Sequence, residues 1–369
     1  MPRSLPLRRL IFADIPLRVL GSTFALGLAG GSLAHLAGVP LGMLIGSLLA
    51  VGGAAAAGLR IFGAPPAVPL RWRDMFIPVI GVAIGATVPP DPLAQAAGWW
   101  VTLAALVAFV PVMHALGYLA YRRLGGLDPT TAFFAAMPGG LIEAITMGDK
   151  AGAEPQMLVT LQFLRIVLCI VSIPLAFALV TGQAVGSAAV AEAATAPPLT
   201  PALGVALVVI GAGGWWLAHL LRLPAPVLIG PLLASAVLHA TGVIAAAPPD
   251  WAVLATQWVV GTSLGTRFAG MDRARLWLGL RLAVLYVAVA MSLAVGLGLT
   301  LADAVGEPVP AVILAFAPGG ISEMSLVAVS LQLAAVYVTL HHVARIVLAV
   351  LVLRLGQRWL PPPDTARFP

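Results

Sequence analysis

The stretch AMPGGLIEAI, residues 136–145, interrupts an apolar segment with a Pro-Gly-Gly break and then adds a carboxylate, Glu143. Proline removes a backbone donor and clashes with the preceding helical turn, and two glycines permit a sharp reversal of the chain. The stretch AFAPGGISEMS, residues 315–325, repeats the break and places Glu323 at the same spacing. The fold therefore has to accommodate two broken helices, each of which carries a charge.

The composition is that of a membrane protein. Of the 369 residues, 60% are hydrophobic and 9% are charged, whereas a soluble domain has about 25% charged residues. The net charge of +6 comes from arginines that flank the apolar runs, so we expect no nucleic-acid partner. The single cysteine, Cys169, lies in an apolar run and is expected to pack in the core. We expect no disulfide, metal site or cofactor.

The chain contains two copies of one unit. The segment AHLAGVPLGMLIGSLLA (residues 34–50) aligns without gaps to AHLLRLPAPVLIGPLLA (residues 218–234), with 10 of 17 positions identical. The two Pro-Gly-Gly stretches match with an offset of 180, and the sequence RIVL recurs with the same offset at Arg165 and Arg345. We therefore expect a first repeat over 1–180, a linker over 181–198 and a second repeat over 199–369.

Ten apolar runs are long enough to be transmembrane helices, at about 17–25 residues each or slightly fewer inside a bundle. They fall at 19–37, 40–58, 75–89, 97–120 and 156–180, and at 201–221, 225–245, 251–266, 276–300 and 334–354. If the Pro-Gly-Gly regions, residues 129–151 and 309–331, also crossed the membrane, each repeat would have six spans and the repeats would be parallel. If both regions are re-entrant hairpins, each repeat has five spans and the repeats are inverted.

Positive residues favour the inverted arrangement. With a cytoplasmic N-terminus it places 18 of the 20 Lys and Arg residues on the cytoplasmic side and the other two, Arg165 and Arg345, inside the membrane. Cytoplasmic loops of membrane proteins carry such an excess. We expect an all-α polytopic membrane protein of two inverted repeats, each with five transmembrane helices and a re-entrant hairpin. Its expected location is a bacterial inner membrane, with both termini cytoplasmic.

The two hairpin tips are expected to meet near the membrane midplane, because an arm of about ten residues reaches about half of the hydrocarbon core. A helix that restarts after the break points its free N–H groups and positive dipole end there, which suits an anion. Glu143 and Glu323 lie in the first turn of the restarted helices. Each glutamate either caps its helix or binds the coupling ion, and the sequence leaves both roles open.

Arg165 and Arg345 each follow their glutamate by 22 residues, inside an apolar helix. Either they pair with a glutamate of one of the repeats, or they clamp a substrate carboxylate or phosphate. One turn earlier, Gln162 and His342 match across the repeats and indicate an asymmetric site. The predicted substrate- and ion-binding residues are Pro138, Gly139, Gly140, Glu143, Gln162, Arg165, Pro318, Gly319, Gly320, Glu323, Ser325, His342 and Arg345. No residue is predicted to be catalytic.

Glycines at a spacing of four also match across the repeats, in GVAIGA (residues 81–86) and GTSLGT (residues 261–266). Small residues at this spacing usually allow close packing of helices. The alternative is an unwound segment that lines the substrate path.

The paired PGG-x-x-E elements, each followed by an arginine, resemble the AbrB family of duplicated bacterial membrane proteins. KAGAEPQMLVTLQFLRIVL (residues 150–168) adds to this resemblance, which covers nearly the whole chain. The second copy departs from the pattern, because it lacks the Gly-Ala-acid turn and has His342 in place of Gln. Members of the family are labelled as ammonia monooxygenases or as regulators of gene expression. The layout is also similar to that of cation/proton antiporters and bile-acid symporters, which is an analogy of fold only.

We expect a secondary transporter, not an enzyme, that moves a small anionic organic solute coupled to protons or sodium. Alternating access would occur at a midplane site between the repeats. The hairpins and the helices that follow them would form a mobile core, with the remaining spans as a scaffold. Its partners would be the bilayer, the solute and the coupling ion; a homodimer is left open. The alternative is a membrane sensor that binds a metabolite in the same cavity and regulates gene expression. A monooxygenase-type oxidoreductase would need a copper or iron constellation, but the six histidines are dispersed except at 341–342.

Overall fold

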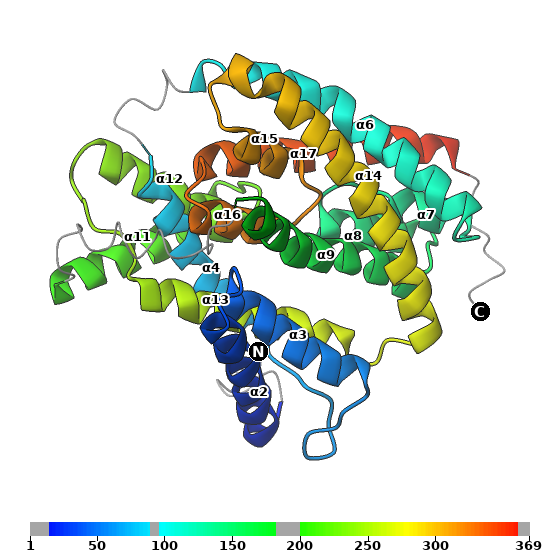
Figure 1. Cartoon of the computed structure of the whole chain (residues 1–369), viewed down its shortest axis with the longest axis horizontal. Coiled ribbons are helices and arrows are strands. Elements are labelled where there is room, and N and C mark those ends of the chain that lie inside the picture. The colour runs from blue at the N-terminus through cyan, green and yellow to red at the C-terminus, as the bar shows by residue number, and fades with distance from the viewer. Residues whose placement is uncertain (1–14, 89–95, 182–199, 361–369) are drawn as a thin grey trace, which may run out of the picture. The chain divides into compact units, whose positions relative to one another are not determined.

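The computed structural model describes residues 15–88, 96–181 and 200–360 (Figure 1). Over these ranges the regular structure is helical, apart from an isolated bridge between Ile61 and Ala64. Nearly all of the predicted linker and both chain termini lie outside the described residues.

Every predicted apolar run contains a helix, and both Pro-Gly-Gly regions are pairs of short helices. In the first repeat the helices are α2 (Leu17–Leu36), α3 (Gly42–Ala56), α4 (Leu70–Gly85), α6 (Trp100–Arg123), α7 (Pro129–Ala135), α8 (Leu141–Lys150) and α9 (Pro155–Thr181). In the second repeat they are α11 (Pro201–Leu220), α12 (Pro226–Ala240), α13 (Asp250–Gly265), α14 (Arg273–Val305), α15 (Val309–Phe316), α16 (Ile321–Ser330) and α17 (Ala335–Gly356).

Six helices of the described chain are long and apolar enough to cross a membrane: α2, α6, α9, α11, α14 and α17. The four other predicted spans, α3, α4, α12 and α13, have 15 or 16 residues. At about 1.5 Å per residue they are shorter than the hydrocarbon core of about 30 Å. The helices α3 and α12 begin late because the chain first passes through left-handed residues, Leu41 (φ 51°) and Ala225 (φ 45°).

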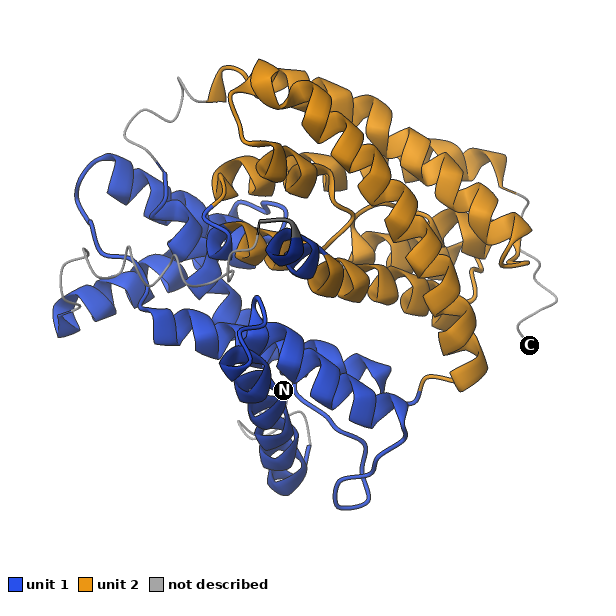
Figure 2. Ribbon diagram, viewed as in Figure 1, with its two compact units in different colours: residues 1–90, 173–270, 329–332 blue, residues 91–172, 271–328, 333–369 orange. Residues whose placement is uncertain are grey.

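The chain forms two compact units, and each takes equivalent helices from both repeats (Figure 2). Unit 1 consists of residues 1–90, 173–270 and 329–332, and unit 2 of residues 91–172, 271–328 and 333–369. Unit 2 contains α7, α8, α15 and α17, and most of α9 and α16, as expected for a core built on the hairpins. It also contains α6 and α14, which the sequence assigned to the scaffold.

The helices α6 and α14 join the hairpins because they pack on each other and on the first tip. A Cβ atom on Gly117 of α6 would lie 2.6 Å from the ring of Tyr286 on α14, so only glycine allows this approach. The Tyr286 hydroxyl in turn donates a hydrogen bond to the carbonyl of Ala136 at 3.3 Å. Tyr286 therefore links α14, and α6 packed against it, to the first Pro-Gly-Gly break.

In unit 1 the packing is reciprocal between the repeats. A Cβ atom on Gly81 of α4 would meet the carbonyl of Leu228 on α12, and one on Gly261 of α13 would meet the carbonyl of Leu44 on α3. The third helix of each repeat thus packs closely against the second helix of the other. The glycines at a spacing of four are therefore packing residues, as predicted for small residues between helices.

We expect Gly261→Ala to destabilise the protein by about 1–3 kcal/mol, because the new methyl group overlaps the α3 backbone and forces the two helices apart. Gly213→Ala is the matched control, since Gly213 is also helical but has nothing within 4 Å of a Cβ atom. Thermal unfolding of the purified variants measures both effects. Equal melting temperatures for the two variants would contradict this packing.

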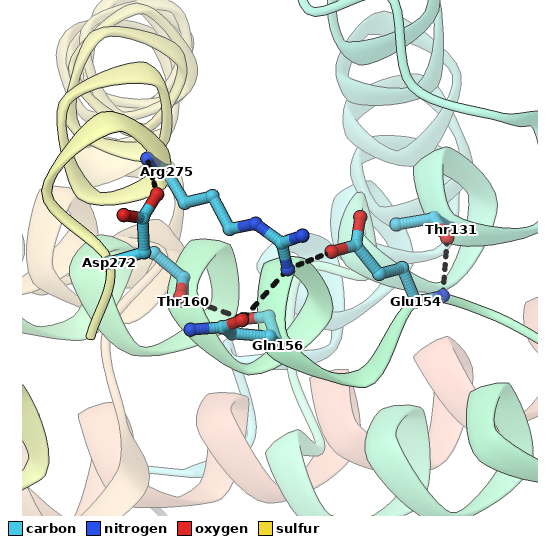
Figure 3. Close-up of polar contacts among 6 residues, drawn as sticks. All are labelled: Thr131, Glu154, Gln156, Thr160, Asp272 and Arg275. Atoms are coloured by element: carbon cyan, nitrogen blue, oxygen red, sulfur yellow. Dashed lines mark hydrogen bonds and ion pairs between the residues drawn. The ribbon is translucent and has the colours of Figure 1, made fainter. Parts of the chain in front are cut away.

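The first Pro-Gly-Gly region folds back on itself within unit 2. Asp128 caps α7 by accepting a hydrogen bond from the Thr131 amide at 2.9 Å, and α8 starts after Gly140, whose φ is 64°. Beyond the end of α8, the Glu154 amide donates to the Thr131 hydroxyl at 2.7 Å (Figure 3). The start of α7 and the connection that follows α8 therefore lie side by side.

A polar cluster links the base of this hairpin to the start of α14. Arg275 donates hydrogen bonds to Glu154 and, at 2.8 Å, to Gln156 (Figure 3). The Arg275 and Glu154 side chains are 44% and 40% exposed, so this ion pair contributes only about 0–1 kcal/mol. The matching positions in the second repeat are Ala334 and Val336, and this polar link therefore belongs to the first hairpin alone.

Candidate functional site

The structure places all thirteen predicted site residues in unit 2. The two tips are buried, including Pro138 and Pro318. Side chains of α9 and α17 reach the end of the short helix that precedes each break. The last carbonyl groups of a helix have no partner within the helix, so they need donors from elsewhere. Equivalent residues of the two repeats supply them.

Gln162 and His342 occupy the same position relative to their hairpins. The Gln162 amide nitrogen donates to the carbonyls of Phe134 and Ala135, each at 3.0 Å. His342 Nε2 donates to the carbonyl of Leu314, also at 3.0 Å. Phe134 and Leu314 both lie 28 residues before the donor. The two side chains are therefore equivalent donors to the ends of α7 and α15.

Arg165 and Arg345 repeat this correspondence one turn later. Arg165 donates to the carbonyl of Met137, and Arg345 to the carbonyl of Ala317, again 28 residues earlier in each case. Arg345 makes a further hydrogen bond to the carbonyl of Gly319 at 2.6 Å. The side chains are buried, with residue exposures of 3% for Arg165 and 1% for Arg345. Both guanidinium groups thus hold the backbone of their own repeat's break.

The two tips also contact the helices of the opposite repeat. A Cβ atom on Gly139 would lie 3.4 Å from Arg345 Nε and 3.7 Å from the Ile346 side chain. A Cβ atom on Gly320 would lie 3.8 Å from the Ile166 side chain. Ile166 and Ile346 are equivalent by the offset of 180. The first tip therefore lies against α17 and the second against α9, so each break contacts the arginine-bearing helix of the opposite repeat.

The glutamates fold back toward the breaks that precede them. A Cβ atom on Gly140 would lie 2.9 Å from Glu143 Oε2, and one on Gly320 would overlap Glu323 Oε2. A carboxylate over the first turn of its own helix is the geometry of a helix cap. Glu323 is 3% exposed and Glu143 is partly exposed. The glutamates thus differ in burial, although their positions in the two helices match.

Ser325 differs from the other predicted residues because its contact has no equivalent in the first repeat. Its hydroxyl lies 2.7 Å from that of Thr339 on α17. The matching residues of the first repeat are Ile145 and Val159. This bond ties α16 to α17 and adds to the asymmetry that Gln162 and His342 already show.

Sequence reasoning missed Tyr286 and His341. Tyr286 bonds the first tip and lies close to both Arg165 and Arg345. His341 is fully buried; Nδ1 lies 2.8 Å from the Tyr337 carbonyl and Nε2 lies 2.9 Å from the Thr102 hydroxyl. A single tyrosine in the apolar run at 276–300 was the available signal for the first residue. His341 was visible as the neighbour of His342, but it cannot share the helix face of that residue, and its partner Thr102 lies 239 residues away.

Glu307 is a further buried carboxylate, just beyond the end of α14. It is 6% exposed and accepts a hydrogen bond from the Trp99 indole at 3.0 Å. Burial raises the pKa of Glu307 above its ordinary value of 4.5, and the Trp99 hydrogen bond opposes this shift. Because the ionised carboxylate is disfavoured in the fold, the protein loses stability as pH rises from 4.5 through the raised pKa.

We therefore expect the stability of Glu307→Gln relative to the wild type to increase as pH rises through this window and then to level off. Glutamine keeps an acceptor for Trp99 but has no charge to bury. Asp303→Asn removes an exposed carboxylate nearby and serves as the control. Melting temperatures over a pH series test this expectation; a constant difference between Glu307→Gln and the wild type would refute it.

No group of three or more His, Cys, Asp and Glu side chains is placed to hold a metal ion within residues 15–88, 96–181 and 200–360. The two helix breaks of unit 2 bring together two buried guanidinium groups, an imidazole, an amide and the buried carboxylate of Glu323. The guanidinium, imidazole and amide donors of this set can bind anions or hold backbone carbonyls.

Similarity to known proteins extends over nearly the whole chain. Residues 43–361 match the family described as "Transition state regulatory protein AbrB". The "Uncharacterized protein YhjN" of Bacillus subtilis (strain 168) is 27% identical over 349 residues, which are 89% of this chain and 90% of the relative. The "Putative regulator AbrB" of Escherichia coli (strain K12) is 27% identical over 189 residues, 50% of this chain and 52% of the relative.

Proposed function

We propose that this chain, which belongs to the AbrB family, is a secondary transporter in a bacterial inner membrane, not an enzyme. It would move a small organic anion, coupled to protons or sodium, by alternating access. The observation that carries the proposal is the presence of two helix breaks inside one compact unit, each lined by a buried arginine. Broken helices that meet where two repeats join are typical of the binding sites of secondary transporters.

The hairpin contacts support re-entrant segments. Because the Glu154 amide bonds Thr131, the first break returns to the end from which it started. If the break of the second repeat returns in the same way, each repeat has five spans and the two are inverted. Irregular backbone at membrane depth persists only inside protein or beside a water-filled cavity, and both tips are buried.

The charge of the centre favours an anionic solute. Arg165 and Arg345 lie close enough for their positive charges to repel each other. The acceptors described for their NH1 and NH2 groups include the neutral carbonyls of Met137, Ala317 and Gly319. Nε of each arginine is buried without a hydrogen-bond partner. An anion of a small carboxylic or phosphoric acid would offset the two charges and use these free donors.

The printed name of the Escherichia coli relative, "Putative regulator AbrB", supports the second candidate, a sensor that binds a metabolite at the same centre. A transporter moves the anion across the membrane, whereas a sensor only binds it. Flux into vesicles therefore separates the two functions.

The test is uptake by purified protein reconstituted into liposomes, using radiolabelled carboxylates and phosphates under imposed proton or sodium gradients. The proposal expects uptake of at least one anion that responds to one of the gradients. Ligands found by thermal shift that bind but are never taken up would favour the sensor. Protein-free liposomes provide the baseline.

Glu143→Gln addresses the role that the sequence left open. The amide keeps the size of the side chain but removes the charge that either caps α8 or binds the coupling ion. If Glu143 only caps the helix, stability falls by about 0.5–2 kcal/mol, and uptake keeps its dependence on the gradient. Because the carboxylate folds back over Gly140, we expect this result. Loss of the gradient dependence at unchanged stability would instead make Glu143 the coupling residue.

A further inference from the structure

The hydrogen bonds of His342 define its protonation state. Nε2 lies 3.0 Å from the Leu314 carbonyl, and Nδ1 lies 2.8 Å from the NH2 group of Arg345. A carbonyl can only accept and a guanidinium can only donate. Nε2 therefore carries the hydrogen and Nδ1 accepts from Arg345. Both bonds are made only when the ring is neutral.

A proton on Nδ1 is incompatible with this arrangement. It would place an N–H group of the ring against an N–H group of Arg345 and add a positive charge to a fully buried site. The charged and titratable groups that act on the ring are Arg345 and His341 from α17 and Arg165 from α9. Two of them are cations, so protonation must break the bond to Arg345 and push the guanidinium away.

Release of Arg345 would change the hydrogen bonds of the second tip and the donors that face the first tip. The NH2 group that bonds His342 also holds the Gly319 carbonyl at 2.6 Å, so its movement frees the second break. Nε of the same side chain lies toward Gly139, immediately before α8, and has no partner. A freed Arg345 therefore has donors available for an anion beside Gly139.

The first repeat lacks this device. Gln162 occupies the position of His342 and donates its amide to Phe134 and Ala135, but an amide does not titrate. Only the second hairpin can respond to a proton in this way. Gln162 therefore holds the first tip permanently, whereas protonation of His342 can release the second tip.

We propose that His342 is the proton-binding residue of the transport cycle, and that proton and anion bind together because each displaces the Arg345–His342 hydrogen bond. The proton enters at Nδ1, and the anion accepts the Arg345 donors that the neutral ring had held and offsets the added charge. The proposal rests on the function proposed above and assigns protons as the coupling ion. One proton would accompany each anion in the same direction.

His342→Gln tests the proton site without a ligand. Glutamine is the residue of the first repeat, where its amide nitrogen donates to the end of α7. It can therefore donate to Leu314 while losing the titration. In the unfolded chain a histidine takes up its proton near pH ~6.5. We expect the wild type to lose more stability than His342→Gln below that pH, by up to about tenfold in the unfolding equilibrium per pH unit. His35→Gln, which removes an exposed histidine, should follow the wild type.

Melting temperatures of the purified proteins across pH provide the measurement, and His342→Asn replaces His342→Gln if that variant does not fold. Parallel pH profiles for the wild type and the His342 variant would overturn the proposal.

Uptake in liposomes is the second experiment. If His342→Gln still takes up anion with an unchanged response to the proton gradient, His342 is not the coupling site although transport stands. If the wild type shows no uptake but the stability difference is present, the transporter function fails while the proton site stands.

Discussion

Arg345→Met is expected to reduce anion uptake by at least about 100-fold. In the proposed cycle the anion accepts hydrogen bonds from the Arg345 guanidinium group. Each charged hydrogen bond contributes about 1.5–3 kcal/mol, where 1.4 kcal/mol is a factor of ten, so the loss of two accounts for about 100-fold. The substitution further removes the hydrogen bonds to Ala317 and Gly319. It also removes one of the two buried charges that would attract the anion. Methionine fills most of the volume of the arginine side chain. The loss of uptake therefore reports the absence of the guanidinium group and not the creation of a cavity.

Arg354→Met is the matched control for this variant. Arg354 lies in the last turn of the same helix, α17, and is exposed. An exposed substitution of this kind changes stability by about 0.5 kcal/mol or less, and uptake should stay near the wild-type level. Initial rates of gradient-driven uptake, measured at equal amounts of reconstituted protein, compare the two variants. Near wild-type uptake by Arg345→Met would remove the arginine from the transport site.

Gly140→Ala is expected to give the second large effect, a loss of both stability and uptake. Gly140 has a φ of 64°, a conformation that costs a residue with a side chain about 1–2 kcal/mol. A Cβ atom there would also lie 2.7 Å from the end of the Met137 side chain and 2.9 Å from Glu143 Oε2. The methyl group therefore adds a steric clash at the tip to the backbone strain, and it displaces the glutamate.

Gly126→Ala separates these two contributions. Gly126 has nearly the same backbone conformation, with a φ of 63°, but nothing lies within 4 Å of a Cβ atom. Gly126→Ala should lose only the stability that the backbone strain costs, and its anion uptake should be unchanged. Thermal unfolding together with initial uptake rates tests the pair. If the two variants lose equal stability and activity, the contacts of the first tip have no special role.

The breaks and the repeat were predictable because they depend on local chemistry. Proline and paired glycines cannot continue a helix, and the structure leaves two residues between the end of α7 and Pro138 and one residue between the end of α15 and Pro318. The reciprocal contacts of Gly81 and Gly261 likewise follow from small residues at a spacing of four. These features need no knowledge of the distant packing.

Other features depend on tertiary structure and could not be predicted. The apolar runs that contain Leu41 and Ala225 give no sign of a left-handed residue, so the first residues of α3 and α12 could not be predicted. The sequence left two roles open for the arginines, an ion pair with a glutamate or a clamp for a substrate anion. It did not predict that each would also donate to a carbonyl 28 residues earlier, at a helix end that lacks internal donors.

The most direct test of the account is the side of the membrane on which each hairpin begins and ends. Single cysteines would replace four exposed residues that flank the hairpins, Arg123, Lys150, Asp303 and Gln332. The native Cys169 is fully buried and should remain unlabelled. An impermeant maleimide applied to intact cells and to inverted vesicles distinguishes the two faces. If both segments are re-entrant, Arg123→Cys and Lys150→Cys are labelled from the cytoplasm only, and Asp303→Cys and Gln332→Cys from the opposite face only. Labelling of the two ends of either hairpin from different faces would contradict the account.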